Sequence, residues 1–271
     1  MSQTRPRIVA MIDKQEGDQP SLDLGQRLLD ERGPGGIEAR SLQWSSYFRI
    51  HHRHVTHMRV GLIFVAGDVA HIHSPFGGQG MNTGLQDVWN LVWKLDLFLQ
   101  GNGNETLLDS YTDERIQVIM SVIELTHRMT MVMGTPSHLA QALRDTVIPM
   151  VSRLAPFQHA FVEKLSELGI EYHGSPIVQG SGERYFDDSI RCGHGILNLY
   201  LLLVGDEVYP STLDAANRLA ESLPEVVELR ASQGIGVTLV RPDGYIGLSA
   251  GHIRGAAALN AVRSLLERQT R

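Results

Sequence analysis

Hydrophobic residues recur along the first half of the chain in a pattern that predicts a strand, a loop and a long helix. Residues 62–66 form a short apolar run, typical of a strand, that ends at Gly67 and Asp68. From residue 81 to about residue 100, apolar side chains recur every three or four positions, which predicts an amphipathic helix. The stretch between them contains Pro75 and several glycines, and it is therefore expected to be a loop.

The same patterns predict helices and strands in the rest of the chain. Helices are expected at residues 22–29, 107–133, 138–168, 211–223 and 256–266, with Ser211 as the N-cap of the fourth. Strands or extended segments are expected at residues 8–12, 37–58, 197–204, 226–229, 237–240 and 245–248. The tetrapeptide Arg241-Pro-Asp-Gly244 predicts a tight turn between the last two strands. This mixture indicates an α/β (α+β) fold.

Residues 169–182 differ in composition from the segments on either side. They are rich in glycine and serine and are punctuated by proline, as is typical of a connection between domains. We therefore predict two domains, residues 1–170 and residues 171–271.

Composition and charge narrow the class of protein. The net charge of −6 and the pI near 6.0 argue against nucleic acid as the main partner. Cys192 is the single cysteine, so no internal disulfide can form, which suits a reducing cytoplasm. The N-terminus has no apolar signal-peptide core, and the longest apolar run, residues 196–204, is too short to span a bilayer. We expect a soluble, cytoplasmic protein.

The strand, glycine loop and helix N-terminus at residues 62–82 together predict an anion site. The free N–H groups of a helix N-terminus and its partial positive charge face a ligand, and glycines allow the ligand to approach the backbone. Asp68, just after the strand, suits a sugar hydroxyl better than a phosphate. The alternative is an ordinary strand–loop–helix turn in which Asn82 caps the helix.

The residue identities in this stretch are more informative about function than its pattern of strand, loop and helix. Residues 67–87 read Gly-Asp-Val-Ala-His-Ile-His-Ser-Pro-Phe-Gly-Gly-Gln-Gly-Met-Asn-Thr-Gly-Leu-Gln-Asp. They resemble the second FAD-binding motif of the flavin-dependent aromatic hydroxylases, the single-component monooxygenases related to phenol hydroxylase. Residues 107–115, Leu-Leu-Asp-Ser-Tyr-Thr-Asp-Glu-Arg, also match that family.

The resemblance implies FAD as cofactor and a set of residues that contact it. Asp68 is expected to bond the ribityl or ribose hydroxyls, Pro75 to lie beside the isoalloxazine ring, and the backbone of residues 80–82 to meet the flavin C2=O edge. The implied cofactor-binding residues are Gly67, Asp68, Pro75, Gly77, Gly78, Gln79, Gly80, Met81 and Asn82.

The resemblance also implies an activity, in which NAD(P)H reduces the flavin and O₂ supplies the oxygen that hydroxylates a phenolic or other small aromatic substrate. No side chain is identified as a catalytic base. Six histidines lie between His51 and His73, but no cysteine or carboxylate joins them at ligand spacing, so we expect no metal site. By the resemblance, His71 and His73 could contact flavin or substrate, but capping or packing within the loop is the role expected of each.

The C-terminal order of elements resembles the thioredoxin-like domain of the phenol hydroxylase branch. The paired cysteines of a working thioredoxin are absent, so a structural or assembly role is expected, with Cys192 as a small buried residue.

Full-length members of the family begin with a Rossmann unit that carries Gly-x-Gly-x-x-Gly, and this sequence contains no such motif. We therefore expect the C-terminal portion of a truncated or split hydroxylase, whose partner is an N-terminal-half polypeptide or a second copy of the chain. The alternative is a non-catalytic remnant, an assembly module that retains only part of the FAD site.

Overall fold

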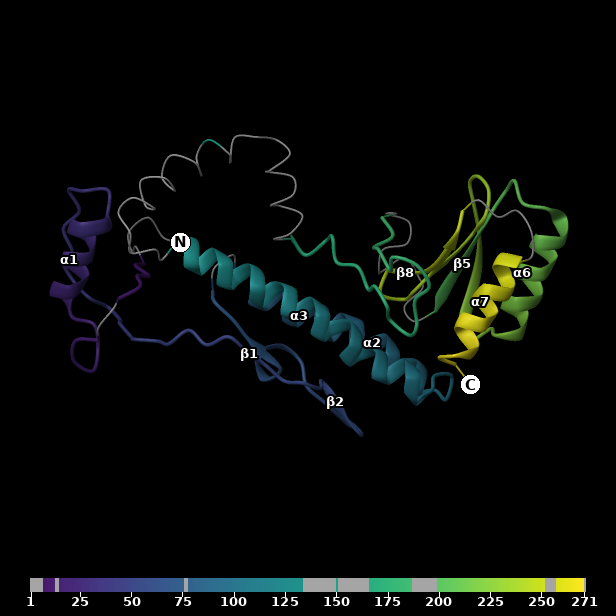
Figure 1. Ribbon diagram of the computed structural model, residues 1–271, viewed down its shortest axis with the longest axis horizontal. Helices are drawn as coiled ribbons and strands as arrows, with labels where there is room; N and C mark the ends of the chain where they lie inside the picture. The colour runs from purple at the N-terminus through teal and green to yellow at the C-terminus, as the bar shows by residue number, and fades with distance from the viewer. Residues whose placement is uncertain are drawn as a thin grey trace.

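The computed structural model describes residues 7–12, 15–75, 78–133, 150, 166–186, 199–251 and 257–270. Figure 1 shows two long helices, α2 (Gly80–Leu99) and α3 (Glu105–Met133), between an N-terminal segment that carries α1 (Leu22–Arg32) and a C-terminal unit of sheet and helices. The predicted mixed α/β fold is confirmed. The predicted division between residues 170 and 171 stays a prediction.

The N-terminal segment contains one of its two predicted elements. Helix α1 begins after Ser21, whose hydroxyl accepts a hydrogen bond from the Leu24 N–H at 3.1 Å, and it ends before Gly33. The strand predicted at residues 8–12 is wrong, because Ile8 and Val9 are exposed and no strand among the described residues pairs with them.

Short strands precede the long helices. Of the extended segment predicted at residues 37–58, only β1 (Arg53–His54) is a strand, and it pairs with β4 (His71–Ile72). The strand predicted at residues 62–66 is reduced to β3 (Ile63–Phe64), which forms a hairpin with β2 (Arg59–Val60). The first two apolar residues of the predicted strand lack cover, since Leu62 is 82% and Ile63 is 71% exposed.

The two long helices confirm the predictions made from their periodicity. A turn separates them, and Asn104 caps α3 by accepting a hydrogen bond from the Thr106 N–H at 2.9 Å. The Asn104 amide also donates to the carbonyl of Arg268 at 3.1 Å, so the start of α3 is tied to the end of the chain. The helix predicted at residues 138–168 and Cys192 lie mostly or wholly outside the described residues.

The C-terminal unit is a four-stranded sheet with the order β6-β5-β7-β8. Strand β5 runs parallel to β6 and antiparallel to β7, and β7 and β8 form the predicted hairpin. The elements in chain order are β5 (Tyr200–Gly205), α6 (Pro210–Ser222), β6 (Val227–Ser232), β7 (Val237–Val240), β8 (Ile246–Ala250) and α7 (Ala257–Glu267). The prediction that Ser211 caps α6 is wrong, because Tyr209 is the N-cap and Pro210 occupies the first turn, where it needs no N–H partner.

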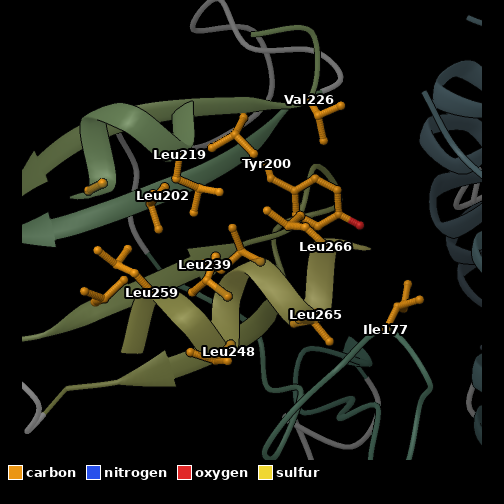
Figure 2. Packing of buried hydrophobic residues seen from close by; sticks show 14 of the residues in the cluster. Ile177, Tyr200, Leu202, Leu219, Val226, Leu239, Leu248, Leu259, Leu265 and Leu266 are labelled. Carbon is orange, nitrogen blue, oxygen red and sulfur yellow. The ribbon is translucent and has the colours of Figure 1, made fainter. Parts of the chain in front are cut away.

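One hydrophobic core joins the sheet to its helices and to the long helices (Figure 2). Alternate residues of β5, including Tyr200 and Leu202, pack against α6 and α7, as the two-residue period of a strand requires. Trp93 of α2 belongs to the same core, and its ring lies edge-on to that of Tyr200 with centroids 5.6 Å apart. The packing therefore fixes the C-terminal unit against α2.

Candidate flavin site

The N-terminus of α2 offers free backbone donors. Its N-cap residue is Gln79, whose side chain makes no capping hydrogen bond, and the first turn contains no acidic residue. Among the described residues, the Thr83 N–H makes the first backbone hydrogen bond of the helix, to the Gln79 carbonyl at 2.9 Å. The N–H groups of residues 80–82 precede it and have no acceptor inside the helix, so this end of α2 suits an anion or a carbonyl. The alternative in which Asn82 caps the helix is wrong, because Asn82 lies inside the first turn.

The Gly-Asp turn lies against the backbone of α2. Gly67 opens a short 3₁₀ helix, η1 (Gly67–Val69), with a φ of 62°, a conformation that favours glycine. A Cβ on Gly84 of α2 would lie 3.2 Å from the Gly67 Cα. Two glycines therefore allow the turn and the helix to meet without a side chain between them.

Asp68 is exposed at this turn, and its carboxylate makes no hydrogen bond or ion pair with any described residue. A carboxylate in this state is available to a ligand hydroxyl. Pro75, Gly78 and Met81 are also exposed beside the start of α2, whereas Gln79 is buried. Gly77 lies outside the described residues, and the assignment of the predicted set to FAD stays a prediction.

Asp87 of α2 is hydrogen-bonded to the backbone of the Gly67-Asp68 turn and holds that turn in place. Its carboxylate accepts hydrogen bonds from the Gly67 N–H at 2.9 Å, from His71 Nε2 at 2.7 Å and from Arg115 Nε at 2.7 Å. Burial alone raises the pKa of Asp87, but the hydrogen bond from His71 and the charge of Arg115 outweigh it, so the pKa is lowered. Asp87 is therefore ionised at neutral pH, and His71 has the packing role expected of it.

A second buried acid reaches the same helix turn from a distant part of the chain. Glu167 is 3% exposed, and its carboxylate accepts a hydrogen bond from the Thr83 hydroxyl at 2.6 Å. Burial raises the pKa of Glu167. The sequence prediction gave no role to Glu167, Asp87 or Arg115. Asp87 and Arg115 do stand at the ends of the two stretches, residues 67–87 and 107–115, that match the hydroxylase family.

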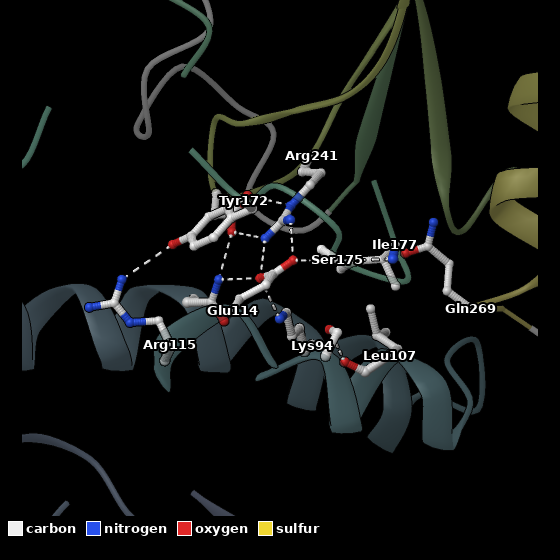
Figure 3. Close-up of polar contacts among 12 residues, drawn as sticks. Lys94, Leu107, Glu114, Arg115, Tyr172, Ser175, Ile177, Arg241 and Gln269 are labelled. Carbon is white, nitrogen blue, oxygen red and sulfur yellow. Dashed lines mark hydrogen bonds and ion pairs between the residues drawn. The ribbon is translucent and has the colours of Figure 1, made fainter. Parts of the chain in front are cut away.

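A separate ion network connects the long helices to the C-terminal hairpin (Figure 3). The Arg241 guanidinium donates to both carboxylate oxygens of Glu114, at 2.6 and 2.9 Å, and to Asp243 at 2.6 Å. Lys94 donates to Glu114 at 2.9 Å, so two cations face two carboxylates. All four side chains are completely or almost completely buried.

The charges of this network depend on one another. Burial alone raises the pKa of Glu114, but Arg241 and Lys94 lower it well below its ordinary range. Burial lowers the pKa of Lys94 to about 8, although Glu114 opposes this shift. Arg241 is also stacked over Tyr172, 4.9 Å from the ring centroid.

Among the described residues, no group of three or more histidine, cysteine, aspartate or glutamate side chains is arranged to hold a metal ion. Within the same residues, no helix has both the length and the apolar character needed to cross a bilayer.

Known proteins resemble the chain over most of its length. Residues 7–126 match the family described as FAD binding domain. A flavin-dependent monooxygenase from Mycobacteroides abscessus is 32% identical over 257 residues, which are 89% of this chain and 49% of the relative. The 6-methylpretetramide 4-monooxygenase of Streptomyces rimosus is 38% identical over 144 residues, 52% of this chain and 26% of that enzyme.

Solved structures show the same fold. The anhydrotetracycline hydroxylase OxyS from Streptomyces rimosus superimposes with a TM-score of 0.69 at 26% identity, over 91% of this chain and 53% of that one. CabE, an aromatic hydroxylase from angucycline biosynthesis, superimposes with a TM-score of 0.72 at 24% identity, over 95% and 55% of the two chains. The chain thus spans about half the length, or less, of the relatives it matches. Its sequence and fold are similar to those of FAD-dependent aromatic hydroxylases.

Proposed function

We propose that this chain supplies the flavin-edge part of the active site of a monooxygenase that hydroxylates a phenolic or other aromatic substrate with NAD(P)H and O₂. The observation that carries the proposal is the uncapped N-terminus of α2 beside the exposed Asp68. Free N–H donors and a carboxylate are the groups that a flavin carbonyl edge and a polyol chain require, so the residues present fit FAD.

Each part of the site has a role in this proposal. The N–H groups of residues 80–82 donate to the flavin C2=O edge, and the positive end of α2 stabilises negative charge there. Asp68 accepts from a ribityl or ribose hydroxyl, and Pro75 lies beside the ring. When bound, FAD supplies the redox chemistry, and the protein orients substrate and cofactor and excludes water.

Asp87 and Arg115 do not contact the cofactor in this proposal; they position the turn that carries Asp68. Asp87 fixes the Gly67 amide, and Arg115 fixes Asp87, so the carboxylate of Asp68 is presented from a rigid turn. His71 makes a further hydrogen bond to the Asp87 carboxylate.

We also propose that the rest of the FAD site, including a Gly-x-Gly-x-x-Gly segment for the pyrophosphate, comes from residues outside this sequence. They belong to the same polypeptide, to a separate N-terminal-half polypeptide or to an associated second copy. The exposed apolar residues of α2, among them Leu85 and Val92, support such an association.

The C-terminal residues 171–271 are proposed to form a thioredoxin-like domain with a structural role. Its βαβ unit, hairpin and final helix support this assignment. The single cysteine supports a cytoplasmic location.

Flavin fluorescence titration tests the proposal. The chain alone is expected to bind FAD weakly, whereas the chain joined to a pyrophosphate-binding segment of a relative, in cis or in trans, should bind it tightly and reduce it with NAD(P)H. A reconstituted protein that assembles but neither binds nor reduces FAD would favour the alternative, a non-catalytic assembly module.

A further inference from the structure

Glu167 combines an unfavourable backbone conformation with an unfavourable burial. Its φ of 55° lies in the left-handed region, which residues with a side chain rarely adopt. Its Oε2 atom is buried, and no described residue donates a hydrogen bond to it. Glycine would suit this backbone and an apolar side chain would suit this burial. The presence of an acid here therefore indicates a role for the carboxyl group.

The contacts of Thr83 indicate what that carboxyl group does. Thr83 Oγ1 lies 2.6 Å from Glu167 Oε1 and 3.0 Å from the carbonyl oxygen of Gln79, the N-cap residue of α2. A hydroxyl has one proton to donate, and a carbonyl can only accept. With Glu167 ionised, Thr83 has two acceptors for a single proton. With Glu167 neutral, the acid donates to Thr83 and the Thr83 hydroxyl donates to Gln79, so each contact has its own donor.

The surroundings of Glu167 favour the neutral form. Burial raises its pKa, and the carboxylate of Asp87 raises it further. The hydrogen bond with Thr83 and the positions of Arg115 and His71 oppose this effect, yet the pKa is raised overall. These groups face Glu167 from α2, α3 and β4. An ionised Glu167 would also leave Oε2 as a charged oxygen without a donor among the described residues.

We infer that Glu167 is a positioning residue of the flavin site, a neutral acid that holds the first turn of α2 through the Thr83 hydroxyl. The inference rests on the proposed function, in which the N–H groups of residues 80–82 meet the flavin C2=O edge. Gln79 and Thr83 flank those three residues. The Thr83 carbonyl also accepts a hydrogen bond from Arg115 at 3.2 Å, so the turn that presents the donors is held at both ends.

The neutral state of Glu167 affects charge as well as geometry. The first turn of α2 contains no acidic residue of its own, so its partial positive charge is available to the flavin edge. A carboxylate beside Thr83 would compete for that charge and would repel negative charge on a reduced flavin. We therefore expect FAD binding to weaken as the pH rises through the raised pKa of Glu167.

The proton on Glu167 is tested in the full chain without FAD. Carbon-13 NMR of the side-chain carboxyls should show Glu167 Cδ titrating above the ordinary glutamate range. The acid form stabilises the native state below the ordinary pKa of 4.5, and this contribution is lost as the pH rises through the higher native pKa. The unfolding free energy of wild type should show this loss, and that of Glu167→Gln should not. A Glu167 Cδ that titrates within the ordinary range would overturn the inference.

Flavin fluorescence titration of the reconstituted protein tests the positioning. Glu167→Gln keeps a neutral side chain whose N–H donates to Thr83, so it should bind FAD as wild type does at low pH and should lose the pH dependence. Glu167→Ala should bind FAD about fivefold more weakly, as for one lost hydrogen bond. Thr83→Val should make these two substitutions equal in effect, because the link to Gln79 is then absent. Glu221→Gln, at an exposed position of α6, is the control and should bind as wild type does.

The outcomes separate this inference from the proposed function. Absence of FAD binding by the reconstituted wild-type protein at every pH would refute the proposed function. Tight binding by wild type, with equal affinities for Glu167→Gln and Glu167→Ala or with parallel pH profiles for wild type and Glu167→Gln, would refute only the role of Glu167. The NMR titration uses wild type, so it remains decisive even if a substituted protein does not fold.

Discussion

Glu114 and Arg115 are consecutive residues of α3, yet their side chains enter two different buried ion networks. Glu114 pairs with Arg241 of the C-terminal hairpin, and Arg115 pairs with Asp87 beneath the Gly-Asp turn. One turn of α3 therefore connects the C-terminal unit to the flavin site. Movement of the hairpin that carries Arg241 would displace Glu114, and through the adjacent residue Arg115 it would also displace Asp87.

Arg241→Met should destabilise the protein strongly. The substitution removes a cation that makes hydrogen bonds to both Glu114 and Asp243, and it leaves Lys94 as the one cation of this network facing two buried carboxylates. Breaking a buried ion network in this way costs roughly 3–5 kcal/mol of unfolding free energy, measurable by urea denaturation. Arg40→Met is the control, because Arg40 is 84% exposed in its pair with Glu38 and should not contribute measurably.

Asp87→Asn should remove part of the acid dependence of stability. The pKa of Asp87 is lower in the native state than in the unfolded chain, where it is about 3.9. The ionised form therefore stabilises the fold above that value, and the contribution is lost as the pH falls through the lower native pKa. Unfolding free energy should fall more steeply below about pH 4 in wild type than in Asp87→Asn. Parallel pH profiles would contradict the role given to Asp87.

Asp68→Ala should affect the cofactor and not the fold. The carboxylate is exposed and makes no bond to the described residues, so the urea midpoint should not change. In the reconstituted protein, FAD binding should weaken by roughly 1.5–3 kcal/mol, as for one lost hydrogen bond to a charged group. Asp214→Ala, at an exposed position of α6, is the matched control. Unchanged FAD affinity in Asp68→Ala would refute the contact.

Gly84→Ala and Gly25→Ala form a matched pair of substitutions inside helices. A Cβ on Gly25 of α1 has nothing within 4 Å, so alanine should stabilise that helix by roughly 0.5–1 kcal/mol. A Cβ on Gly84 meets the Gly67 backbone at 3.2 Å. Gly84→Ala should therefore lose this gain and weaken FAD binding by displacing the turn. Equal thermal stabilisation by both substitutions, with normal FAD binding, would contradict the close approach.

The sequence predicted the long helices well because their apolar period is strong and continuous. Helix α2 begins at Gly80, one residue from the expected start, and α3 extends the expected range by two residues. The turn at residues 241–244 was equally clear, since Pro242 fixes its own φ and Gly244 can adopt the positive φ of 84° that the turn has. The helices and this turn are determined mainly by residues close together in sequence, so the sequence alone predicts them.

Features that depend on distant partners were not predictable. Ile8 and Val9 have the composition of a strand, but a strand requires another strand to bond to, and none of the described ones is available. Lys94 and Glu114 look like solvated helix residues until Arg241, 127 positions after Glu114, is brought against them. The Gly-Asp motif indicated where the site is, whereas the groups beneath it became visible only in three dimensions.

The distance in sequence between Glu114 and Arg241 also sets an order of assembly during synthesis. The ribosome completes α2 and α3 long before it makes the hairpin, 127 residues after Glu114, that supplies Arg241. At about 5–20 residues per second, the nascent helices wait roughly ten seconds with Lys94 and Glu114 incompletely neutralised. The long helices cannot complete this network until the hairpin has emerged, so the contact between α3 and the C-terminal unit is among the last to form in the described part of the chain.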